Sequence, residues 1–238
     1  MVKSWPHLVT MFALLFALNL QLAAEPAYRT RTIEGWTVHV EESLLSNDSE
    51  MTENALKLLQ QQLAEIVRVV PGEAVAKLRE VPLWFSPPYD GVRPGAEYHP
   101  NVRWLRANGR NPAMVKCVEF TDIKNFEKEM RRMPNFTLHE LAHAFHDRVL
   151  SFDHPEVIAA FQRAKTAKLY DQVERTLGDG SPNTREKAYA MTNHREYFAE
   201  TTEAFFSRND FFPFDRAELE QHDPQMAELL RRLWGVAK

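Results

Sequence analysis

The chain has 238 residues, of which 44% are hydrophobic and 26% charged, so it can bury a packed core and is not globally disordered. Its single cysteine, Cys117, excludes a disulfide scaffold and a cysteine-rich zinc module. The net charge of −4 gives no basic surface for nucleic acid, and the composition excludes collagen, coiled coils and proteins with several membrane spans.

The N-terminus has the pattern of a secretory signal peptide. Lys3 provides a positive charge, residues 8–22 are almost wholly apolar, and Ala23-Ala24 offers small residues for cleavage. We therefore predict a signal peptide over residues 1–24 and a secreted or periplasmic protein of residues 25–238, with no membrane attachment once the signal is removed. An uncleaved N-terminal anchor is the alternative, although the apolar run is short for a membrane span.

The first half of the remaining chain predicts mixed structure. Alternating β-rich residues indicate a strand, helically spaced leucines indicate a long helix that Pro71-Gly72 ends, and a stretch rich in Gly, Pro and Asn indicates an ordered loop with little regular structure. The predicted elements are a strand at 32–40, helices at 50–70 and 74–79, strands at 81–85 and 115–120, and the loop at 94–112.

The second half predicts helices. The expected helices are 123–133, 136–151, 155–175, 193–207 and 216–234, with a flexible loop at 178–184. We find no internal repeat and no low-complexity segment. The pattern predicts one α+β domain over residues 25–238, with a small sheet in its N-terminal half and a helical C-terminal half.

The chemistry is concentrated in residues 139–143, which read His-Glu-Leu-Ala-His. Positions i and i+4 share one helix face, so the imidazoles of His139 and His143 can bind one zinc ion, while Glu140 can take a proton from a water on the metal. The rest of this helix is apolar, and two buried histidines without partners would be costly. We therefore predict one Zn²⁺ bound by His139 and His143, with Glu140 as general base.

A third ligand is needed. His146 lies about 10 Å along the helix axis from His139, too far to share the ion, so a satisfied core histidine is its default role. The metzincin pattern is excluded because His146 stands where that class has glycine. The remaining candidate is a carboxylate on a later helix.

Glu196, Glu200 and Glu203 lie on one face of that later helix, at i, i+4 and i+7. The simpler interpretation is that these three glutamates form an acidic face exposed to solvent. The density of aromatic residues around them favours instead Glu196 as the third ligand and Glu200 as a hydrogen-bond partner of a ligand histidine. Asn193 fits as the N-cap of this helix.

These residues resemble the catalytic domain of the anthrax lethal factor family of zinc metallopeptidases. The resemblance covers 137–206 and rests on the residues 139–143 motif followed by Tyr189-(six residues)-Glu196-Tyr-Phe-Ala-Glu200. It implies that His139, His143 and Glu196 bind zinc, that Glu140 activates the water, and that Tyr189 stabilises the oxyanion or protonates the leaving amine. From the residues alone, Tyr189 is by default a half-buried core residue, although its position allows its hydroxyl to reach the metal.

The sequence thus predicts a secreted zinc metallopeptidase with a zincin-like α+β domain, acting as a monomer on a peptide or protein substrate. We expect an unspecified sheet edge to bind an extended substrate by strand addition. A catalytically inactive zinc-binding protein of the same fold and a zinc hydrolase of a non-peptide amide are the alternatives. His99 either lines the cleft or stabilises a turn, and Asp147 either orients a ligand histidine or caps a surface. Asn135 is interpreted as a helix cap.

Overall fold

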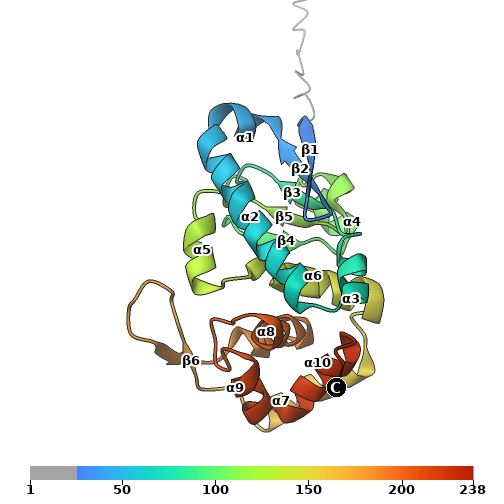
Figure 1. Ribbon diagram of the computed structural model, residues 1–238, viewed down its shortest axis with the longest axis vertical. Helices are drawn as coiled ribbons and strands as arrows, with labels where there is room; N and C mark the ends of the chain where they lie inside the picture. Colours follow the sequence, from blue (N-terminus) through green and yellow to red (C-terminus); the bar gives the residue numbers. More distant parts are fainter. Residues whose placement is uncertain (1–25, 238) are drawn as a thin grey trace, which may run out of the picture.

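A five-stranded sheet occupies the N-terminal part of the chain in the computed structural model, which describes residues 26–237 (Figure 1). The predicted signal peptide lies outside the described residues. The strand order is β1-β2-β3-β5-β4, in which β2, β3 and β5 run parallel while β1 and β4 are antiparallel edge strands. The strands are β1 (Tyr28–Ile33), β2 (Trp36–Glu41), β3 (Leu83–Phe85), β4 (Ala96–Tyr98) and β5 (Val118–Phe120).

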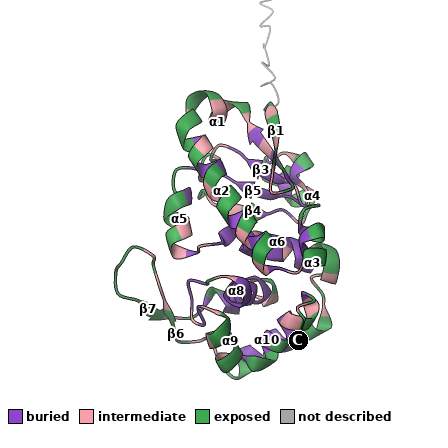
Figure 2. Cartoon of the chain, in the orientation of Figure 1, coloured by how far each residue is buried: buried purple, intermediate pink, exposed green. Residues whose placement is uncertain are grey.

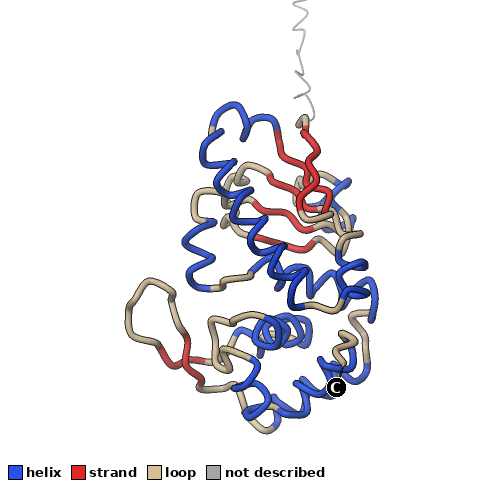
Figure 3. Tube along the Cα trace, viewed as in Figure 1, coloured by secondary structure: helices blue, strands red, loops and turns tan. Residues whose placement is uncertain are grey.

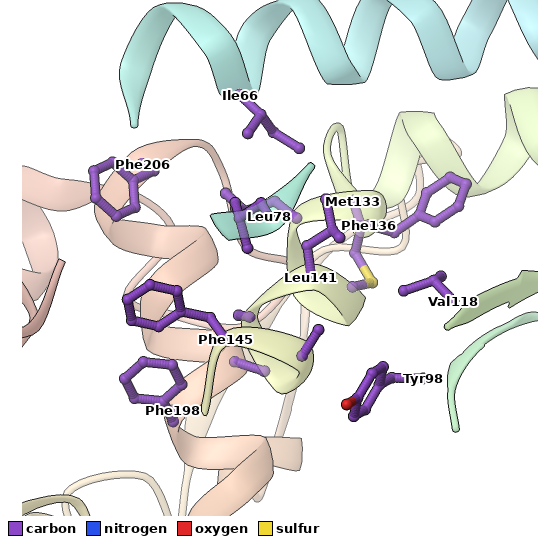
Figure 4. Packing of buried hydrophobic residues seen from close by; sticks show 14 of the residues in the cluster. Ile66, Leu78, Tyr98, Val118, Met133, Phe136, Leu141, Phe145, Phe198 and Phe206 are labelled. Carbon is purple, nitrogen blue, oxygen red and sulfur yellow. The ribbon is translucent and has the colours of Figure 1, made fainter. Parts of the chain in front are cut away.

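Helices cover one face of the sheet. Alternate strand residues such as Val38, Phe85 and Phe120 are buried against α2 and α6, because successive side chains of a strand point to opposite faces. Figure 4 shows part of this core, where Leu141 of α6 lies between the sheet and the helices around it. The helices of this half are α1 (Glu42–Asn47), α2 (Ser49–Val69), α3 (Gly72–Leu78), α5 (Phe126–Arg132) and α6 (Phe136–Phe145).

The opposite face of the sheet is covered by residues 86–117. Trp84 of β3 packs there in a second, smaller cluster with Leu105, Met114 and Cys117, all of them buried. The loop expected at 94–112 contains β4 and α4 (Val102–Ala107), and a short 3₁₀ helix (Pro112–Met114) begins at its end. The expectation was wrong because strand pairing with β5 and burial of Leu105 override the local Gly, Pro and Asn composition.

The C-terminal half is built around α8 (His194–Phe206), which is buried from Tyr197 to Phe206 (Figure 2). The other elements surround it: α7 (Pro155–Thr166), the hairpin β6 (Val173–Arg175) and β7 (Thr184–Glu186), α9 (Arg216–His222) and α10 (Pro224–Leu233). Figure 3 shows the hairpin projecting from this helical half. The helix α8 packs directly on α6, so the two halves meet at the segments that carry the predicted metal ligands.

Several predicted boundaries change for local reasons. The strand expected at 32–40 is two strands, because Glu34 and Gly35 take positive φ values and reverse the chain between β1 and β2. The helix expected at 216–234 breaks before Pro224, which begins α10. The helix expected at 136–151 continues as a π-helix over His146–Leu150, and that expected at 155–175 ends at Thr166.

The mixed α+β architecture is confirmed, with the small sheet in the N-terminal half and helices in the C-terminal half. Within residues 26–237, no helix combines the length and apolar character needed to cross a membrane.

Candidate metal centre

Two capped helices bring the predicted ligands together. The Asn135 side chain accepts a hydrogen bond from Leu138 N–H at the start of α6, as expected of a cap. Asn193 caps α8 in the same way, accepting from the N–H groups of Arg195 and Glu196. The cap places Glu196 in the first turn of α8, where α8 crosses α6.

His139, His143 and Glu196 converge on one point. The Oε2 atom of Glu196 lies 3.3 Å from His139 Nε2 and 3.2 Å from His143 Nε2. Tetrahedral zinc with ligands at ~2.1 Å separates neighbouring ligand atoms by about 3.4 Å, so the two measured separations fit such a site. Burial opposes the charge of Glu196, but hydrogen bonds from the two histidines hold the pKa of this carboxyl well below its usual range. The donor set therefore suits one divalent cation.

The hydrogen-bond partner of His139 is Glu203, which corrects the expectation for Glu200. Glu203 Oε2 lies 2.7 Å from His139 Nδ1, whereas Glu200 Oε1 is 3.9 Å away and the other oxygen of Glu200 accepts from Asn209 at 3.2 Å. Each residue of a helix is rotated by about 100° around the axis, so Glu203, at i+7, points within about 20° of Glu196. Glu200, at i+4, points about 40° away from it. The bond at Nδ1 leaves Nε2 of His139 facing Glu196 and His143.

The three glutamates of α8 do not form a solvated face, because Glu196 is partly buried and Glu200 and Glu203 are buried. Glu200 is 2% and Glu203 0% exposed, and burial raises the pKa of Glu200 to about 8 and that of Glu203 to about 7. A third buried acid, Asp210, lies near both and pairs with Arg132 and Arg175. The two arginines balance the charge of Asp210, while the charge of His139 lowers the pKa of both glutamates against the larger effect of burial.

Glu140 lies beside the ligands and contacts the sheet. Its Oε2 atom accepts a hydrogen bond of 2.8 Å from the backbone N–H of Tyr98, the last residue of the edge strand β4. Burial raises the pKa of Glu140, and the two ligand histidines and the Tyr98 N–H oppose this. One carboxylate oxygen of Glu140, the predicted general base, is therefore held by the edge strand of the sheet. No sequence pattern predicted this contact.

Tyr189 lies in the short 3₁₀ helix (Tyr189–Met191) that precedes α8 and contacts it. Tyr189 is 49% exposed, so it is half-buried, as expected from the residues alone, but it is not part of the core. Partial burial, and then the charge of Glu196, raise the pKa of its phenol, with His139 and Glu140 also within electrostatic range. The phenol thus shares the electrostatic environment of the candidate ligands.

The other histidines of interest lie outside the centre. His99 is buried and its Nε2 atom lies 2.8 Å from Glu119, so it does not line an open cleft. His146 is buried among Phe152, Phe198 and His194, and neither of its ring nitrogens has a hydrogen-bond partner within residues 26–237. The prediction that His146 is a core histidine is thus confirmed, but its two ring nitrogens lack the hydrogen bonds that were expected.

Two imidazoles and a carboxylate from two buried helices, with another buried carboxylate beside them, form a candidate centre for a catalytic divalent metal. Residues 117–234, just under half of the chain, match the family model described as glucose-regulated metallo-peptidase M90. The matched segment contains all three candidate ligands, and the match supports a metallopeptidase family. It does not single out the anthrax lethal factor family that the sequence resembles. No curated protein and no solved structure matches the chain.

Proposed function

We propose that the protein is a zinc-dependent metallopeptidase with a zincin-like domain similar to that of the anthrax lethal factor family, and that it acts as a monomer outside the cytoplasm after loss of residues 1–24. The observation that carries the proposal is the convergence of His139, His143 and Glu196 within 3.3 Å contacts, beside the buried carboxylate of Glu140. The match of residues 117–234 to a metallopeptidase family supports the same reaction class.

A zinc ion bound by these residues would polarise the scissile carbonyl and lower the pKa of the attacking water toward ~7. Glu140 accepts the proton of that water through the carboxylate oxygen that Tyr98 N–H does not occupy, and returns it to the leaving amine. The phenol of Tyr189 donates a hydrogen bond to the oxygen that becomes negative as the carbonyl is attacked. Glu203 holds the His139 ring in orientation through Nδ1.

The outer edge of β4 suits an extended peptide. At the two ends of the β4–β5 pairing, Gly95 C=O accepts from Thr121 N–H and His99 N–H donates to Cys117 C=O. The alternation of an antiparallel ladder therefore turns the backbone groups of Ala96 and Tyr98 away from β5. Since Tyr98 N–H bonds to Glu140, the groups left for a substrate are both backbone groups of Ala96 and the C=O of Tyr98. Strand addition here would place a peptide beside Glu140. This edge favours a peptide over a small non-peptide amide.

The test is a comparison of metal content and peptide hydrolysis in three purified proteins. We expect the wild type to contain one zinc and to cleave members of a peptide library, and Glu140→Gln to keep the metal but lose cleavage. Glu127→Gln, a change of the same chemistry at an exposed residue of α5, should behave as the wild type. Turnover retained in Glu140→Gln would reject the mechanism, and a zinc-loaded wild type without turnover would reject the peptidase assignment in favour of an inactive zinc-binding protein.

A further inference from the structure

Tyr98 is hydrogen-bonded at two points to the helical segment that carries two of the candidate ligands. Its backbone N–H donates to Glu140 Oε2 at 2.8 Å, and its phenol donates to Asp147 Oδ2, also at 2.8 Å. Glu140 lies in α6 and Asp147 in the π-helix that continues it, about two turns further along. One residue of the sheet edge therefore bonds to two successive parts of the same helical segment.

The carboxylate of Asp147 is itself fixed from the sheet side. Its side chain is 14% exposed and pairs with Lys116 Nζ, while the backbone N–H of Lys116 donates to His99 C=O at 2.7 Å. Lys116 precedes β5, and His99 directly follows β4. Contacts among Tyr98, Asp147 and Lys116 thus connect β4 and the residues just before β5 to the π-helix. None of the three is a candidate metal ligand.

Strand β4 needs such an attachment. It has three residues, lies at the edge of the sheet and pairs with one neighbour only, so its backbone ladder supplies few hydrogen bonds. The phenol of Tyr98 is buried, and a hydrogen bond from a buried hydroxyl to a carboxylate is stronger than one between neutral groups. The side chain of Tyr98 is therefore positioned to fix the strand against α6.

We propose that Tyr98 and Asp147 are a positioning pair that fixes the outer edge of β4 relative to Glu140. The inference rests on the proposed function, because the edge matters for catalysis only if a peptide binds along it. A peptide on this edge is placed by Ala96 and Tyr98, and the proton acceptor is placed by the N–H of the same strand. Loss of the phenol would loosen the substrate and the base together, whereas the ligands on α6 and α8 would be unaffected.

Tyr98→Phe tests the pair because it removes one oxygen atom from a buried ring. Tyr170→Phe is the matched control, since it also removes a buried tyrosine hydroxyl that donates to a buried aspartate, Asp223, at 3.3 Å, but in the C-terminal half and away from β4. We expect Tyr98→Phe to lower kcat/KM for an extended peptide on the order of tenfold and to affect a single-residue amide less, with zinc content unchanged. Tyr170→Phe should leave both activities close to wild type.

Asp147→Ala should reproduce the loss, and the double variant of Tyr98→Phe and Asp147→Ala should be no worse than Asp147→Ala alone, because Asp147→Ala already removes the hydrogen bond that Tyr98→Phe removes. Additive losses, or an equal loss for the extended peptide and the single-residue amide, would overturn the proposal.

Amide hydrogen exchange separates this proposal from the peptidase assignment because it needs no activity. The N–H of residue 98 bonds to Glu140, so its exchange should become about tenfold faster in Tyr98→Phe and stay unchanged in Tyr170→Phe. Unchanged exchange at residue 98 would refute the positioning pair even in an active enzyme. Faster exchange in a protein whose wild type lacks turnover would support the fixation of β4 while rejecting the proposed function.

Discussion

His139 Nδ1 lies 2.7 Å from Glu203 Oε2, and this contact sets which nitrogen of the ring faces the candidate metal. Glu200, one turn earlier on α8, lies 3.9 Å from the same nitrogen and bonds to Asn209. The two buried glutamates are therefore not equivalent, although the sequence places both on the face of Glu196.

Replacement of Glu203 should weaken metal binding more than replacement of Glu200. Glu203→Ala leaves the Nδ1–H of His139 without its acceptor, and loss of such a partner costs about 10- to 100-fold in metal affinity. Glu200→Ala should cost less. Competition between the protein and a chromogenic zinc chelator measures both affinities, and a larger loss in Glu200→Ala would reverse the assignment.

Glu196→Ala should abolish stoichiometric zinc binding. Two imidazoles from one helix remain, and a catalytic zinc site normally has three protein ligands. Elemental analysis of the dialysed protein should show one zinc in the wild type and far less in Glu196→Ala, as in His139→Ala. Full zinc retention in Glu196→Ala would exclude it as the third ligand. Glu97→Ala, an exposed acid on β4, is a control that should keep the metal.

Tyr189→Phe should reduce turnover with little change in metal content. The charges of Glu196 and Glu140 act on the phenol, and removal of one oxyanion donor typically lowers kcat by about 100-fold. Steady-state kinetics with a peptide substrate measure the effect, and it should fall on kcat more than on KM. A variant with wild-type kcat would remove Tyr189 from the mechanism.

His146 should make the protein less stable in acid. Burial lowers its pKa in the folded state to about 3, whereas an unfolded histidine titrates near ~6.5. Between these values the unfolded chain binds the extra proton, so the free energy of unfolding falls as the pH falls, by about 1.4 kcal/mol per pH unit from this group, and is unaffected above pH ~6.5.

Urea unfolding of wild type and His146→Phe between pH 4 and pH 7 isolates the histidine. Glu200 and Glu203 have raised pKa values and therefore act in the opposite sense, but they contribute to both proteins. We expect the stability of the wild type relative to the variant to decline toward pH 4. A constant difference across this range would contradict the neutral, buried state of His146.

The parts of the site that depend on local patterns could be predicted from the sequence. The spacing of His139 and His143 and the cap at Asn193 are properties of single helices, and the structure has both helices. The choice between Glu200 and Glu203 depends on how α8 crosses α6, which no pattern within α8 contains.

The edge strand was missed for a related reason. Three residues are too few to show an alternating pattern, and β4 exists because it pairs with β5 and bonds to Glu140 through Tyr98. The same holds for the hairpin of β6 and β7, whose strands are equally short and flank residues that indicated only a loop.

The apolar contact between α6 and the C-terminal helices bears on how the protein would respond to loss of its metal. Beyond the candidate ligands, the ring of Phe145 stacks on Trp234 of the C-terminal segment with centroids 4.0 Å apart, and the ring of Phe198 of α8 lies 6.1 Å from Trp234. Figure 4 shows Phe145 and Phe198 next to each other. These rings join the two halves by hydrophobic burial, so their attachment does not depend on a shared ion. We therefore expect the apoprotein to remain folded, and treatment with a chelator to switch the enzyme off reversibly rather than denature it.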